Sequence, residues 1–168
     1  MYRSIRLALA ILIVAAAGVA GPARAGEGAV AVELTANRVT KSQGKEVLVP
    51  ADKAQPGELI EYRALYRNDG KSDARGLMAT LPIPLGTQYV PNSALPRGVE
   101  ASLDGRTFAA VPLKRMEKLP DGRAVEREVP VAEYRALRWP LGALPAKQSR
   151  TVTARVRIEP TPVAANTH

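Results

Sequence analysis

Residues 56–91 read PGELIEYRALYRNDGKSDARGLMATLPIPLGTQYVP, and this stretch indicates an all-β fold. Apolar residues alternate with mostly charged ones in its first half, with Leu65 as one exception on the charged side. The residues on the apolar side are Ile60, Tyr62, Ala64 and Tyr66. A period of two residues is typical of a half-buried strand, so the pattern predicts a strand over residues 59–67.

Turn signals separate this strand from its neighbours. Pro56-Gly57 suits a type II turn, because proline presets the first φ and glycine tolerates a positive second one. Asn68, Asp69 and Gly70 take left-handed conformations at little cost, and we expect the next strand over residues 75–81.

Two Asp-Gly dipeptides predict hairpins further along the chain. Asp104-Gly105 lies between strand candidates at 99–103 and 106–111, which predicts a two-residue hairpin turn. Asp121-Gly122 lies between 113–119 and 124–129, where charged residues dominate. That second hairpin is expected to be an exposed ribbon or a long edge loop.

The rest of the chain supports the same fold class. Alternation also marks residues 30–35 and 151–158, and residues 45–49 form a short further candidate. The 14 prolines and 13 glycines leave few windows long enough for a helix. We therefore predict a single Ig-like antiparallel β-sandwich of about seven to nine strands.

The first 25 residues have the pattern of a signal peptide. Arg3 and Arg6 precede an apolar run over residues 7–20, and Ala23-Arg24-Ala25 suits a signal peptidase. The run is shorter than the roughly 20 residues of a membrane-spanning helix, although an uncleaved anchor stays an alternative. The two arginines are not adjacent and the chain has no cysteine, so neither twin-arginine export nor a lipoprotein is expected. We predict Sec export, cleavage before Gly26, and a periplasmic or secreted protein.

Composition narrows the possible functions. Cleavage of 25 from 168 residues leaves 143, one domain's worth, and removes three arginines from a net charge of +8, which leaves +5. The absence of cysteine excludes thiol catalysis, disulfides and cysteine zinc sites. Basic residues are spread along the chain, so they indicate a solvated surface or weak attraction to anionic envelope polymers. No aromatic platform accompanies them, and nucleic acid is not an expected partner.

Several ordered motifs resemble the DUF11 conserved-repeat family. They are Pro56-Gly57 with Ile60 and Tyr62, Asn68 with Gly70, Leu81-Pro82, Gly86-Thr87 with Tyr89-Val90-Pro91 and Ser93, the segment Ala101 to Phe108, Arg138-Trp139, Leu144-Pro145 and the final strand. The resemblance covers about residues 50–158 of a domain expected at 26–160. It implies an exported Ig-like sandwich without a reaction. It further implies a core that contains Tyr62, Tyr66, Phe108 and Trp139, with Asp104 and Gly105 in a hairpin turn.

No catalytic or metal-binding constellation stands out. The single histidine, His168, ends a tail at 161–168 that we expect to be disordered, so a second group cannot orient it. Glu126 and Glu128 share one face of a predicted strand, but the surrounding charges favour an exposed edge over a glycosidase cleft. The loop at 68–73 carries oxygen donors without the EF-hand register. We predict a non-enzymatic protein without cofactor or metal.

Two functional hypotheses follow. The first is a structural or protein-interaction module of the envelope, whose partner is an envelope protein or surface polymer. Its proposed surface is the charge-rich ribbon: Lys114, Arg115, Glu117, Arg123, Glu126, Arg127 and Glu128. The alternative is a binding domain for cell-wall glycan or another anionic ligand, with Tyr89 and Phe108 as possible contacts. An aromatic content of only 4% counts against carbohydrate stacking, so we favour the interaction module.

Overall fold

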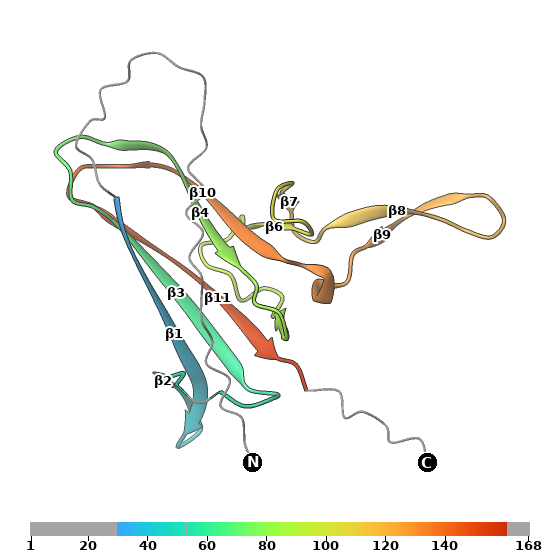
Figure 1. The fold of residues 1–168 in the computed structure, drawn as a ribbon, viewed down its shortest axis with the longest axis horizontal. Coiled ribbons are helices and arrows are strands. Elements are labelled where there is room, and N and C mark those ends of the chain that lie inside the picture. Colours follow the sequence, from blue (N-terminus) through green and yellow to red (C-terminus); the bar gives the residue numbers. More distant parts are fainter. Residues whose placement is uncertain (1–29, 53, 161–168) are drawn as a thin grey trace.

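The computed structural model describes residues 30–52 and 54–160, which form two β-sheets and a projecting ribbon (Figure 1). The predicted signal peptide and the predicted disordered tail lie outside these described residues. Eleven strands and one 3₁₀ helix, η1 (Val131–Glu133), make up the described secondary structure. Nine of the strands belong to the two larger sheets, and the other two form the ribbon.

The first sheet has five strands in the order β2-β1-β3-β11-β5. Their bounds are β1 (Val30–Ser42), β2 (Lys45–Pro50), β3 (Leu59–Asn68), β5 (Thr87–Tyr89) and β11 (Ser149–Ile158). The second sheet has the order β4-β10-β6-β7. Its strands are β4 (Ala74–Pro82), β6 (Glu100–Ser102), β7 (Ala109–Ala110) and β10 (Ala136–Leu144). All pairings are antiparallel, which confirms the predicted all-β sandwich.

Strand β3 lies at the centre of the first sheet, as its alternating sequence predicts. Ala64 is opposite Leu34 of β1 and Val152 of β11, so the apolar sides of three strands form one row. Tyr62 and Tyr66 point to the same side and are 3% and 7% exposed. Burial raises the pKa of both tyrosines, which agrees with their place in the core.

Strand β10 fills the same position in the second sheet. Leu137 and Trp139 lie in the core, and the Trp139 side chain is 1% exposed. Its indole Nε1 donates a hydrogen bond of 3.0 Å to the Pro96 carbonyl, so the buried polar group is satisfied. Trp139 is therefore a core residue, as expected.

Phe108 does not lie between the sheets, and the expectation that it fills the core was wrong. Its ring lies 4.1 Å from the guanidinium carbon of Arg138. Arg138 alternates along β10 with the buried Leu137 and Trp139, so its side chain and Phe108 lie on the outer face of the sheet. A cation–π contact there replaces core burial.

The Asp104-Gly105 segment also differs from the prediction. Strand β6 ends at Ser102 and β7 begins at Ala109, so a six-residue loop replaces the expected two-residue turn. The Asp104 carboxylate accepts hydrogen bonds from the N–H groups of Arg106 and Thr107 and from the Ser102 hydroxyl. These bonds hold the loop in place of strand pairing, and they lower the pKa of Asp104 to about 2.

The turn after β3 is held by a buried asparagine. The Asn68 amide donates to the carbonyls of Ser72 and Leu144, both at 2.9 Å, and its oxygen accepts from the Gly70 N–H. Asn68 is fully buried, so these bonds tie the β3–β4 turn to the end of β10. The turn before β3 uses Gly57, whose φ of 86° suits glycine, while Pro56 beside it is exposed.

Candidate interaction site

Strands β8 (Lys114–Lys118) and β9 (Ala124–Glu128) form a two-stranded ribbon that extends away from the sandwich (Figure 1). The N–H of Leu119 donates to the Arg123 carbonyl, which closes the tip, and Gly122 there has a φ of 86°. The second predicted hairpin is thus an exposed ribbon, one of the two forms that the sequence indicated.

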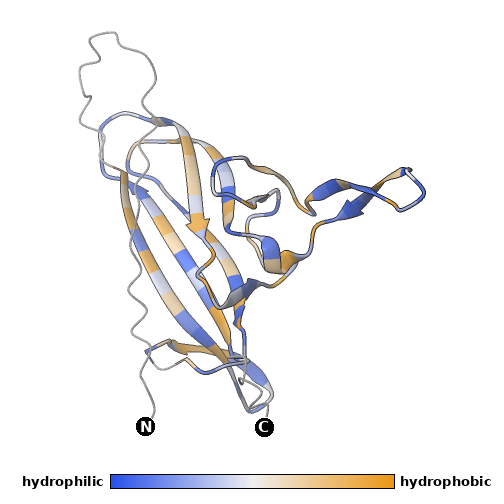
Figure 2. Cartoon of the chain, turned by 45° about the vertical axis from the view of Figure 1, so that its right-hand side comes forward, coloured by the Kyte–Doolittle hydropathy of each residue, from blue (hydrophilic) through white to orange (hydrophobic). Residues whose placement is uncertain are grey.

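Charged side chains cover the ribbon, and Figure 2 shows both of its strands as largely hydrophilic. The structure brings the seven predicted surface residues together on this ribbon, and all seven are exposed. Lys114 and Glu126 form an ion pair of 2.7 Å across the strands, and the hydrogen bond to Glu126 raises the pKa of Lys114. Arg127 pairs with Glu117 at 3.0 Å, so opposite charges alternate along the ribbon.

One like-charged pair interrupts this pattern. Arg115 and Arg127 are directly opposite each other in the ladder, an arrangement that normally destabilises a sheet. Arg127 is compensated by Glu117, while Arg115 forms an ion pair of 2.7 Å with Glu133 of η1. Glu133 was not identified from the sequence, since it lies outside the ribbon and no periodic pattern connects it to Arg115.

Both outer edges of the ribbon are unpaired within the described part of the chain. The Val129 N–H donates to the Leu113 carbonyl, so the backbone groups of residue 129 point inward, to the β8 side of the ribbon. Because this direction alternates along a strand, the backbone N–H groups of Glu126 and Glu128 point to the open edge of β9. A strand of another protein could accept hydrogen bonds from these two N–H groups.

The base of the ribbon is anchored in the core. Leu113 and Val129 flank the two strands and are 7% and 3% exposed. The Leu113 N–H donates a hydrogen bond of 2.9 Å to the hydroxyl of Tyr134, which is 1% exposed. Three buried side chains therefore fix where the ribbon leaves the sandwich. Tyr134 was not identified from the sequence either.

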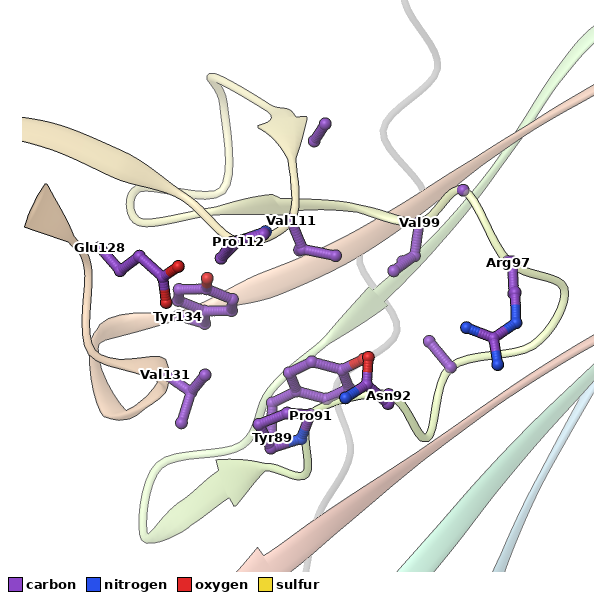
Figure 3. A pocket seen from close by; sticks show the side chains of 13 residues that line it. Tyr89, Pro91, Asn92, Arg97, Val99, Val111, Pro112, Glu128, Val131 and Tyr134 are labelled. Atoms are coloured by element: carbon purple, nitrogen blue, oxygen red, sulfur yellow. The ribbon is translucent and has the colours of Figure 1, made fainter. Parts of the chain in front are cut away.

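A pocket of about 460 Å³ lies at this base (Figure 3). Tyr89 and Tyr134 contribute stacked rings, with centroids 6.3 Å apart and planes at 15°. Apolar side chains line most of the wall, while Asn92, Arg97 and Glu128 supply polar groups. Three separate stretches of the chain, 89–99, 110–112 and 128–134, form this pocket, so no local sequence pattern could reveal it.

Tyr89 and Phe108, the two aromatic residues considered as glycan contacts, do not offer a free ring face to a sugar. Tyr89 is 3% exposed, and burial raises the pKa of its hydroxyl. Phe108 is covered by Arg138. Over residues 30–52 and 54–160 the structure contains no group of three or more metal-ligating side chains. Within the same residues no helix combines the length and the hydropathy needed to cross a membrane.

Comparison of the chain with protein-family models, with curated proteins and with solved structures found no match. The resemblance to the DUF11 family therefore stays a prediction that rests on the quoted motifs.

Proposed function

We propose that this chain is a non-enzymatic, exported β-sandwich module that binds another protein of the cell envelope through the β8–β9 ribbon. The observation that carries the proposal is a projecting two-stranded sheet with buried anchors, whose outer edges pair with no other strand among the described residues. An unpaired edge accepts an additional strand through main-chain hydrogen bonds, and flanking side chains select the partner. The alternating charges of Lys114, Glu117 and Glu126 would provide that selection.

Export is the first part to test. The full coding sequence is expressed in a bacterium, and the mass of the accumulated protein is measured in the soluble envelope fraction. A product that begins at Gly26 is expected, because the Ala23-Arg24-Ala25 sequence precedes that residue. A full-length product in the cytoplasm would contradict the export proposal.

The ribbon is tested with two variants of one residue. Glu126→Ala removes the ion pair with Lys114 but keeps the outward N–H, whereas Glu126→Pro also removes that N–H. Wild-type and variant proteins are used as baits for crosslinking capture from envelope extract at low and high salt. We expect capture of a discrete protein that survives high salt with wild type, is weaker with Glu126→Ala because one selecting charge is missing, and is lost with Glu126→Pro.

A matched control lies at the C-terminal end of β3, outside the ribbon. Asp69→Ala removes the carboxylate of an exposed ion pair with Arg67, as Glu126→Ala does with Lys114, without touching the ribbon. Capture should be unchanged in that variant. Recovery of polymer or lipid alone, lost at high salt, would contradict the interaction module and favour the anionic-ligand alternative.

A further inference from the structure

The pocket at the base of the ribbon shares Glu128 with the open edge of β9 and has features of a small-molecule site. Its volume of about 460 Å³ lies within the range typical of ligand pockets. The hydroxyl of Tyr134 accepts a hydrogen bond from the Leu113 N–H, so this ring is held in position. Val99, Val111 and Val131 add aliphatic wall. A preformed, largely apolar cavity with a few polar groups results.

The polar groups of this pocket are available to a ligand. Within the described residues the side chains of Asn92, Arg97 and Glu128 make no hydrogen bond and no ion pair. All three are exposed. Glu128 lies opposite Lys114 in the ladder, but the Lys114 ammonium forms its ion pair with Glu126, and Arg127 pairs with Glu117.

The two charged groups are far from each other. Figure 3 shows Glu128 at one end of the pocket and Arg97 at the other, with the rings of Tyr134 and Tyr89 between them. A guanidinium binds a carboxylate, and a carboxylate binds an ammonium group. In a free α-amino acid the ammonium and carboxylate groups are bonded to the same carbon atom, whereas a short peptide places at least one peptide unit between them.

We propose that this pocket binds a short zwitterionic peptide with an apolar side chain. The peptide carboxylate contacts Arg97, its ammonium group contacts Glu128, and the apolar side chain lies against Val111 and Val131, which are only partly buried. The Asn92 amide offers a donor and an acceptor to the peptide bond. This inference does not depend on strand addition at the ribbon.

The test uses the protein in the form that accumulates in the bacterium. The probes are one dipeptide and its three blocked forms. Glycyl-phenylalanine carries both charges. Its N-acetyl form imitates the carboxyl terminus of a longer chain, its amide imitates an amino terminus, and the doubly blocked form is neutral. Binding is followed by NMR through the methyl signals of Val99 and Val131 and the ring signals of Tyr134. The doubly charged dipeptide should bind about tenfold more tightly than either singly blocked form.

Two variants test which side chain binds each charged end of the dipeptide. Arg97→Gln should reduce affinity for the dipeptide about three- to tenfold and remove its advantage over the amide form. Glu128→Gln should likewise remove its advantage over the N-acetyl form. Arg106→Gln and Glu159→Gln alter exposed residues outside the pocket and should bind like wild type.

Several outcomes would overturn the proposal. Equal binding of the N-acetyl form would show that a protein carboxyl terminus is the ligand, and equal binding of the amide would indicate an amino terminus. Equal binding of the neutral form would show that the charges play no part. Shifts confined to residues outside the pocket would place the ligand elsewhere, and no shift at millimolar probe would show that the pocket binds no such peptide.

Discussion

The sandwich and the ribbon belong to one chain but are stabilised by different interactions. In the sandwich, Leu137, Trp139 and Val156 are at most 1% exposed and pack between the sheets. In the two strands of the ribbon no residue is buried, and only Val125 reaches intermediate burial. Its strands are held by their hydrogen-bond ladder, by surface ion pairs and by the anchor at the base.

This difference separates the determinants of stability from those of the proposed binding. Burial of apolar surface provides most of the stability of a domain, whereas an exposed ion pair contributes little. Changes between the sheets should therefore unfold the protein, while changes on the ribbon should alter recognition and leave the fold intact. Each of the following predictions tests one side of this contrast.

The largest effect is expected at Trp139. Replacement by alanine removes the side chain that fills the core beside β10 and leaves the Pro96 carbonyl without its donor. Trp139→Ala should lower the free energy of unfolding by about 3–5 kcal/mol, measured by urea denaturation. Leu85→Ala is the control, because Leu85 is 88% exposed. A near-wild-type urea midpoint for Trp139→Ala would show that the core does not depend on this side chain.

The second effect concerns a polar group in the sandwich. Asn68→Ala removes three side-chain hydrogen bonds and leaves the buried carbonyl of Leu144 without the amide donor. The expected loss in unfolding free energy is about 2 kcal/mol, again by urea denaturation. Gln148→Ala should change little, because Gln148 contacts Asn68 only through its backbone. A loss no larger than that of Gln148→Ala would show that water replaces these bonds.

The strands of the sandwich could be predicted because their signal is local. The period-two alternation around Tyr62 and Val152 predicts that these segments are strands, and it also predicts which side of each strand faces the core. The ribbon was predictable for the opposite reason. Charged residues on both sides of Asp121-Gly122 leave no apolar face to bury, so these strands had to be exposed.

The remaining features depend on contacts between distant segments. Phe108 is apolar and near a strand, yet Arg138, 30 positions later, covers its ring on the outer face. Asp-Gly is typical of a tight hairpin, but here the Ser102 hydroxyl and two N–H groups satisfy Asp104 in a longer loop. The pocket needs Arg97 and Glu128 together, and only the completed fold brings them to one cavity.

A smaller effect is expected in the β6–β7 loop, where stability should depend on pH. The folded-state pKa of Asp104 is about 2, below its usual value of 3.8, so the charged form stabilises the fold. That contribution is present above about pH 4 and is lost as the pH falls toward 2. Asp104→Asn should be less stable than wild type at pH 5, and the gap in melting temperature should narrow toward pH 2. A gap that is constant over this range would contradict the hydrogen-bonded carboxylate.

The smallest effect on stability is expected in the ribbon. Glu117→Gln removes the partner of Arg127 and leaves that side chain opposite Arg115 without compensation. Both groups of the pair are more than half exposed, so the unfolding free energy should change by no more than about 0.5 kcal/mol. Backbone amides of β8 and β9 should nevertheless exchange with solvent faster than in wild type, and about 1 M salt should remove the difference because it screens the arginines. If Glu117→Gln instead lowers global stability as Trp139→Ala does, the ribbon unfolds together with the sandwich. Its charges would then have to be counted among the determinants of the fold.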